Sequence, residues 1–209
     1  RFQNQAIENS VPFDILVHSE NPDDAFDEEL AAIHDQCRTE DTWSYQIYQD
    51  GKQVMNEYLY THGGTVSKKY RNPDGSLNEK AVEEDGYEYY SYDTYMRISD
   101  YNHLREMLGY EPVALGQDKY AVQIKERMVP FLDDKIKART LDTSLGELTL
   151  DEIYTIPFSQ NGNNGADYLI IVPDEAAAGM DGYFSELAVS TEGKAPSDLQ
   201  QTLETIRLK

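Results

Sequence analysis

The sequence predicts an α+β fold in which both chain ends build a ferredoxin-like split β-α-β lobe around an inserted, mixed α+β lobe. Three observations predict it. The chain opens with the patterns of a strand, a helix and a hairpin, and it closes with those of a strand, helix, strand and helix. A polar, turn-rich stretch separates the two series. Residues 1–71 and 151–209 then form the split lobe and residues 72–150 the inserted lobe, within a single domain of 209 residues.

The first third of the chain contains a strand, a helix and a hairpin. Apolar residues alternate over 11–17, as in a half-buried strand. Asn21 can cap a helix over 22–36 that starts with proline and carries acidic residues at the positive end of its dipole. Asp50-Gly51 then predicts a hairpin turn, with the returning strand over 54–60.

The middle of the chain alternates polar loops with short elements. In order, we expect a short helix near 79–84, a strand over 87–98, a helix that follows it, a strand over 120–124 and a short helix within 128–139. Ser99 or Asp100 can cap the helix after the strand, and Gly109 can end it in a left-handed conformation. Its apolar face consists of Tyr101, Leu104 and Leu108.

The last third is more apolar. In order, we expect one or two strands over 145–158, a turn at 160–165, a central strand over 167–173, a short helix over 174–180, a strand over 186–190 and a helix over 196–206. The last helix is expected to bury Leu199, Leu203 and Ile206.

The charge balance disfavours anionic partners. The chain has 18 basic and 39 acidic residues, for a formal net charge of −21. Such a surface repels nucleic-acid phosphates and anionic lipid headgroups. It attracts cationic partners and divalent ions, although a solvated acidic surface without any partner explains the charge equally well.

No catalytic or metal-binding motif is present. The four histidines lack metal-site spacing, and the sequence contains no P-loop, GxGxxG or GxSxG motif. His34 and Cys37 fall on one helical face, but no third group is placed to orient them, so we interpret Cys37 as a buried thiol. We expect a protein that is not an enzyme and that has no cofactor and no metal site.

Tyrosines and acidic residues supply the candidate ligand site. In the 87–98 strand the face with Met96 and Ile98 is interpreted as core, whereas the face with Tyr89 and Tyr95 can be either core or binding surface. Tyrosine rings beside carboxylates suit a cationic, amphipathic peptide. The acidic residues near 23–29 also have a purely structural explanation, because they stabilise a helix start. The candidate ligand-binding residues are Tyr87, Tyr89, Tyr95, Asp93, Asp23, Asp24, Asp27 and Glu28.

Three segments resemble parts of the large extracellular domain between the first two membrane helices of FtsX/MacB-type ABC-transporter permeases of Gram-positive bacteria. They are VPFDILVHSE at 11–20, ISDYNHLREMLGYEPVAL at 98–115 and DYLIIVPDE at 167–175, and they follow one another in the order that suits the family. The middle segment is the most specific of the three. Within this family, the sequence resembles the bacitracin-resistance-like branch.

The resemblance implies a non-catalytic domain on the extracellular side of the cell membrane. Flanking membrane helices would join it to a cytoplasmic ABC ATPase subunit, where ATP is hydrolysed, and a sensor kinase can be a further partner. The domain would sense or grip a cationic antimicrobial peptide, a cell-wall lipid intermediate or a complex of the two. No apolar run in the chain reaches the roughly 18 residues that cross a bilayer, and Arg1 follows no visible secretory signal, so we expect a piece of a longer protein.

Two other functions stay open. The domain can be an extracellular scaffold that recruits or regulates a cell-wall hydrolase or lipoprotein, as the cell-division branch of the same superfamily does. It can also be a secreted carbohydrate-active enzyme that uses a pair of carboxylates, since acidic pairs occur throughout the chain.

Overall fold

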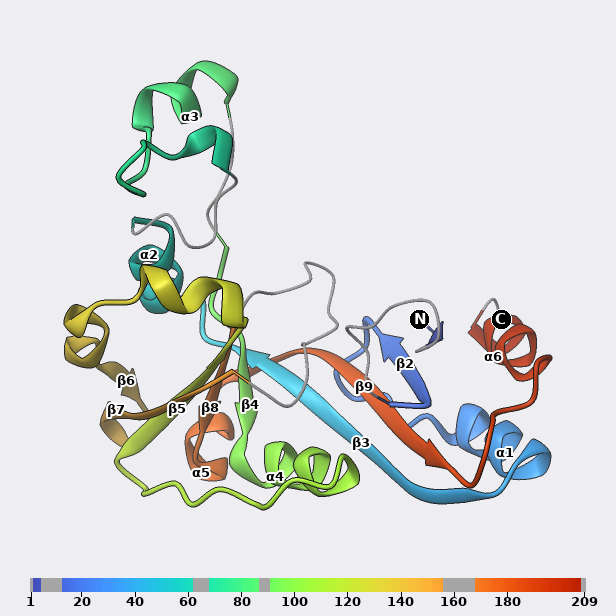
Figure 1. Cartoon of the computed structure of the whole chain (residues 1–209). Coiled ribbons are helices and arrows are strands. Elements are labelled where there is room, and N and C mark those ends of the chain that lie inside the picture. The colour runs from blue at the N-terminus through green and yellow to red at the C-terminus, as the bar shows by residue number, and fades with distance from the viewer. Residues whose placement is uncertain (1, 5–12, 62–67, 87–90, 156–167, 208–209) are drawn as a thin grey trace.

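A computed structural model describes residues 2–4, 13–61, 68–86, 91–155 and 168–207. Within them the chain forms one nine-stranded mixed sheet, in the order β1-β2-β9-β3-β4-β8-β5-β7-β6, with helices packed against it (Figure 1). This is an α+β fold, as the sequence predicts.

The elements have the following bounds. The strands are β1 (Phe2–Asn4), β2 (Ile15–Ser19), β3 (Thr39–Gln49), β4 (Tyr95–Arg97), β5 (Lys119–Ile124), β6 (Leu141–Thr143), β7 (Gly146–Tyr154), β8 (Tyr168–Val172) and β9 (Asp181–Thr191). The α-helices are α1 (Asp27–Gln36), α2 (Val54–Thr61), α3 (Glu79–Asp85), α4 (Ile98–Met107), α5 (Asp174–Ala177) and α6 (Leu199–Arg207). The 3₁₀ helices are η1 (Lys68–Tyr70), η2 (Glu126–Phe131) and η3 (Asp134–Ala138).

Both ends of the chain contribute to one split β-α-β unit. Strand β9 lies between β2 and β3 and is antiparallel to both, so β2 and β3 run in the same direction with α1 connecting them. Helices α1 and α6 contact each other at this end of the sheet (Figure 1). The core between them and the sheet consists of Ile15, Val17, Phe26, Ile33, Leu187, Val189, Leu199 and Leu203.

The two ends of the described chain lie at the same end of the molecule (Figure 1). Strand β1 pairs with β2 at the edge of the sheet, and it also contacts α6. Strand β2 is the neighbour of β1 in the sheet, and β9 is the last strand before the C-terminal helix α6. No helix in the described ranges is both long and apolar enough to cross a membrane.

Strand β8 joins the two halves of the sheet. It lies between β4 and β5, parallel to the former and antiparallel to the latter, so residues 72–150 share one continuous sheet with the C-terminal range. Apolar side chains cover both faces here: the adjacent residues Tyr95 and Met96 are both buried, in different clusters. Because a strand buried on both faces shows no apolar–polar alternation, the tyrosine pattern could not separate core from surface.

Helix α1 begins at Asp27, and not at Pro22 as the sequence predicts. Asn21 starts a turn instead of capping a helix: its carbonyl accepts from Asp24 N at 3.2 Å and its side chain accepts from Asp23 N at 3.0 Å. Asparagine and aspartate favour such turns because their short side chains bond to backbone groups two residues on. The turn displaces the helix start, and the predicted end at residue 36 is correct.

Residues 54–61 form helix α2 and not the predicted hairpin strand. Met55, Tyr58 and Leu59 have helical spacing and are fully buried. The carboxylate of Asp93 accepts from the backbone N–H groups of Met55 and Asn56, each at 2.9 Å. Because this carboxylate comes from a distant part of the chain, no local pattern marks the helix start.

Two other predictions need correction. The strand predicted over 87–98 is reduced to β4 in the described residues, because helix α4 already begins at Ile98; residues 87–90 lie outside the described part. Neither Ser99 nor Asp100 caps α4, since both lie inside it. The helix predicted within 128–139 consists of the two 3₁₀ helices η2 and η3.

Several predicted elements are correct. Strand β8 is fully buried, α5 follows it, and α3 occupies the polar stretch after residue 72. Figure 1 shows η1 and α3 standing apart from the sheet, where they form a small cluster of their own with Tyr60, Tyr70 and Val82. Gly109 ends α4 with a φ of 83°, as expected.

Replacement of Gly109 by alanine is expected to lower the free energy of unfolding by about 1 kcal/mol, because a positive φ is unfavourable for a residue with a Cβ. Nothing lies within 4 Å of the position that this Cβ would occupy, so the cost comes from the backbone alone. Urea denaturation followed by circular dichroism measures it. Gly109→Asn should cost less, since asparagine tolerates this conformation, and equal losses for the two variants would contradict the explanation.

Candidate functional site

Four of the predicted site residues lie together before and within the first turn of α1. Asp23 and Asp24 precede the helix, and Asp27 and Glu28 begin it. Asp24 is half-buried and the other three are exposed. We call residues 21–28 the acidic loop.

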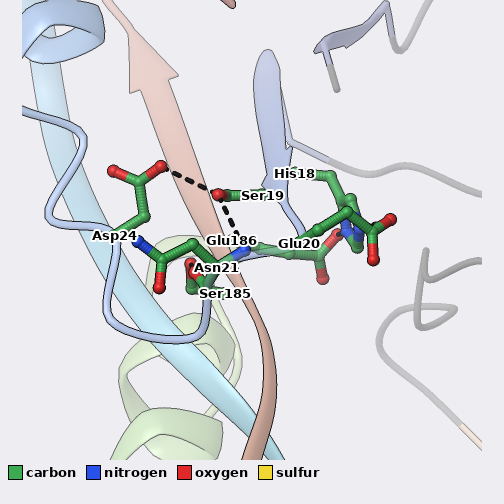
Figure 2. Close-up of polar contacts among 7 residues, drawn as sticks. All are labelled: His18, Ser19, Glu20, Asn21, Asp24, Ser185 and Glu186. Atoms are coloured by element: carbon green, nitrogen blue, oxygen red, sulfur yellow. Dashed lines mark hydrogen bonds and ion pairs between the residues drawn. The ribbon is translucent and has the colours of Figure 1, made fainter.

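Hydrogen bonds to two neighbouring strands hold the acidic loop. Ser19, at the end of β2, donates to the Asp24 carboxylate at 2.8 Å and accepts from Asn21 N at 3.2 Å. Figure 2 shows Ser19 between these two partners. Ser185 of β9 donates to the Asn21 carbonyl at 2.6 Å. The acidic loop is thus bonded to both strands that lead to the chain ends.

Asp24 positions the start of the helix. Its second carboxylate oxygen accepts from Phe26 N at 2.9 Å, so both of its oxygens are engaged within the loop. Phe26 has a φ of 58°, which is unfavourable for a bulky residue, and its ring is fully buried. Burial of the ring and the bond to Asp24 therefore maintain a strained backbone beside the exposed carboxylates.

Two hollows flank the acidic loop. The first has a volume of about 430 Å³ and lies over the start of α1, where Asp27, Glu28 and Ile206 line it. The second has a volume of about 340 Å³ and lies on the sheet. Asp24 and Ala25 line both. We call the second hollow the β3 groove.

The β3 groove has a polar floor and carries charges from two sides. The floor comes from one face of β3 and from β9: Ser44, Gln46, Tyr48 and Ser185. Asp23 approaches from the β9 side, and its carboxylate accepts a long hydrogen bond of 3.4 Å from Gln46 Nε2. Arg97 approaches from β4, which pairs with β3 on the opposite edge. The groove therefore holds a carboxylate and a guanidinium on opposite sides of one strand.

Arg97 is fixed by a buried carboxylate. Its Nε and Nη2 donate to the two oxygens of Asp100, each at 2.9 Å, and Asp100 also accepts from Trp43 Nε1 at 3.0 Å. The Asp100 side chain is fully buried and that of Arg97 is 36% exposed. The hydrogen-bonded Asp100 raises the pKa of Arg97, which stays protonated under all ordinary conditions. Two-point contact of this kind fixes the guanidinium plane.

A row of polar residues crosses the opposite face of the same strands. His18, Glu186 and Tyr45 lie opposite one another on β2, β9 and β3. Glu186 accepts from the Tyr45 hydroxyl at 3.1 Å, and its other oxygen lies 3.5 Å from His18 Nδ1. Burial raises the pKa of Glu186 above its ordinary value, against the opposing effect of His18. The residues next to this row, Ser19 and Ser185, hold the acidic loop (Figure 2).

Asp93 and Tyr95 do not face a ligand, contrary to the sequence prediction. Both side chains are fully buried. Asp93 caps α2 and accepts from the Tyr168 hydroxyl at 2.8 Å, and the Tyr95 hydroxyl donates to the half-buried Asp50 at 3.0 Å. These residues stabilise the packing of α2 on the sheet.

Three further predictions concern two tyrosines, Cys37 and a metal site. Tyr87 and Tyr89 lie outside the described residues. Cys37 is half-buried at the end of α1, where its thiol donates to the Ile33 carbonyl at 3.3 Å and burial raises its pKa. Among the described residues, no group of three or more histidine, cysteine, aspartate or glutamate side chains is placed to hold a metal ion.

The sequence did not reveal the residues that form the floor of the β3 groove, or Arg97 at its side. Tyr48 and Arg97 are far apart in sequence, and only the pairing of β3 with β4 brings them together. One signal was present: Ser44, Gln46 and Tyr48 recur at every second position of a strand whose alternate positions carry Trp43, Tyr45 and Ile47. That pattern predicts a polar face, although it does not tell a binding surface from a solvated one.

No protein-family model and no curated protein matches this sequence. Among solved structures, one described as a "putative lipoprotein from Bacillus anthracis" is similar in outline, with 8% sequence identity, a TM-score of 0.45, and coverage of 91% of this chain and 90% of that one.

Proposed function

We propose that this chain is a non-catalytic extracellular domain of an FtsX/MacB-type ABC-transporter permease, which grips a cationic ligand at the acidic loop. The observation that carries the proposal is the anchoring of this loop. Ser19 and Ser185 bond it to β2 and β9, the strands that lead to the two chain ends. A ligand that pulls on the loop would therefore load both connections to the flanking membrane helices.

Two further features support the proposal. Strand β1 and helix α6 lie side by side, so two membrane helices could continue from one end of the domain. The net charge of −21 and the exposed Asp23, Asp27 and Glu28 attract a cationic peptide. Hydrolysis of ATP would take place in a cytoplasmic ATPase subunit, and the ligand would be an antimicrobial peptide or its complex with a cell-wall lipid intermediate.

The test is calorimetric titration with bacitracin at low and physiological salt. A variant that combines Asp23→Asn, Asp27→Asn and Glu28→Gln should bind at least tenfold more weakly than the unaltered domain, because it removes three exposed charges beside the two hollows. A matched variant removes three exposed charges from α3: Glu79→Gln, Glu83→Gln and Glu84→Gln. This control should stay within about twofold. Equal losses in both variants, or undetectable binding by the unaltered domain at low salt, would count against a ligand site at the acidic loop.

A further inference from the structure

We propose that the β3 groove binds a zwitterionic ligand, with an ammonium group beside Asp23 and a carboxylate beside Arg97. The free ends of a short peptide have this chemistry. The inference rests on the proposed function, since it takes the acidic loop as the ligand site, and it deepens that function by adding an anionic contact. It follows from the charges on both sides of β3, from polar groups without partners, and from the size of the groove.

The charges of the groove come from opposite sides of one strand. Asp23 is exposed, and among the described residues its carboxylate contacts only Gln46, at 3.4 Å, so it can take up an ammonium group without losing a strong bond. Both carboxylate oxygens of Asp24, in contrast, already accept hydrogen bonds, so this residue lines the β3 groove without being available to a ligand. A purely cationic ligand would use the Asp23 side and leave Arg97 without a partner in the groove.

The guanidinium of Arg97 is held in a fixed position from which it can donate hydrogen bonds to an anion. Asp100 binds two of its nitrogens, and no described residue accepts from its Nη1. Because Asp100 already fixes the side chain, a ligand carboxylate would immobilise no additional rotamers on binding. Asp100 also balances the charge, so the attraction depends on directed hydrogen bonds from the guanidinium more than on net charge.

The floor offers neutral hydrogen-bonding groups between the two charges. In the described part of the chain, neither the Tyr48 hydroxyl nor the Ser44 hydroxyl has a hydrogen-bond partner. Burial raises the pKa of Tyr48, so its hydroxyl keeps its proton and can donate to a ligand carbonyl. A volume of about 340 Å³ is near the lower limit for ligand pockets and suits a molecule of dipeptide size.

The test compares four forms of one dipeptide. Alanyl-alanine, its N-acetyl form, its C-terminal amide and the doubly blocked form are titrated into the domain, with binding followed by NMR chemical shifts. We expect the free dipeptide to bind and each single block to weaken binding at least fivefold. Asp23→Asn should weaken the free dipeptide at least fivefold but leave the N-acetyl form within twofold. Asp198→Asn, an exposed aspartate near α6, is the matched control and should change nothing.

The four forms separate this inference from the proposed function. If the amide binds as well as the free dipeptide, the groove is a simple cation site: the inference fails and the proposed function stands. If the N-acetyl form binds as well as the free dipeptide, Asp23 takes no part in binding: the inference fails, and the bacitracin titration alone decides the proposed function. Absence of binding by all four forms at 10 mM overturns the inference alone, since the bacitracin titration is independent. The amide tests Arg97 without a mutation that would disturb its pair with Asp100.

Discussion

Replacement of Asp100 by alanine is expected to lower the free energy of unfolding by about 2–3 kcal/mol, less than the roughly 3–5 kcal/mol for breaking a fully buried ion pair, because water reaches the 36% exposed side chain of Arg97. Asp100 is fully buried and accepts two bonds from Arg97 and one from Trp43. The variant leaves a guanidinium and an indole N–H without their acceptor. Urea denaturation followed by circular dichroism measures the loss.

The only tryptophan of the chain gives a second, local measurement. Because Trp43 Nε1 donates directly to Asp100, its fluorescence spectrum should shift in the native state of the variant, before any unfolding. Ser99→Ala provides the control: Ser99 is adjacent and exposed, and its side chain makes no hydrogen bond with a described residue, so we expect a change below about 0.5 kcal/mol. A loss below about 1 kcal/mol for Asp100→Ala would show that solvent or another residue replaces the carboxylate.

Asp100 belongs to the segment 98–115, and several other polar side chains of this segment have structural roles as well. Asn102 both donates to and accepts from the backbone of Val113, and Arg105 donates to the Glu111 carbonyl at 2.7 Å. His103 bonds to Asp41 at 2.7 Å and stacks on Trp43. The segment therefore fixes α4 and the chain that follows it to the sheet. These contacts give the polar residues of the segment structural roles.

The parts of the fold that could be predicted from sequence depend on local physics. The buried strand β8, the stop at Gly109 and the pairing of both chain ends follow from apolar runs, backbone preferences and element order. The failures have non-local causes. Helix α2 is capped by a carboxylate distant in sequence, and α1 starts late because Asn21 and Asp24 form a turn.

In the candidate site, too, local features could be predicted from the sequence and non-local ones could not. The exposed acids of the acidic loop were found because charge and position near a helix start are local properties. Arg97 was missed because its place in the groove depends on the pairing of β3 with β4. Asp93 was assigned to the wrong role because an acidic residue among tyrosines has the same local pattern in a binding surface and in a buried cap.

Replacement of Asp93 by alanine is the second large effect that we expect, with a loss of about 2–4 kcal/mol. The change removes the acceptor of two buried backbone N–H groups, those of Met55 and Asn56, and of the Tyr168 hydroxyl. Each buried donor left unpaired costs about 1–3 kcal/mol, and relief from burying a charge offsets part of the total. Asp93→Asn keeps one carbonyl acceptor and should lose less.

The same residue predicts an unusual dependence of stability on pH. Burial raises the pKa of Asp93 to about 6 in the folded protein, against an ordinary value near 3.8. The folded state therefore binds this proton more tightly than the unfolded state. The stabilisation that comes from binding this proton is complete below pH 3.8 and is lost as the pH rises through about 6. For a pKa shift of this size the total change in the free energy of unfolding is roughly 3 kcal/mol.

The measurement is the difference in unfolding free energy between the unaltered protein and Asp93→Asn from pH 4 to pH 7. Asparagine cannot titrate, so the difference isolates Asp93 from the other carboxylates of this acidic chain. It should shift in favour of the unaltered protein as the pH falls from 7 to 4, with most of the change between pH 6 and 4. A difference that does not vary with pH would mean that the carboxylate stays charged beneath α2, held by its three hydrogen bonds despite its burial.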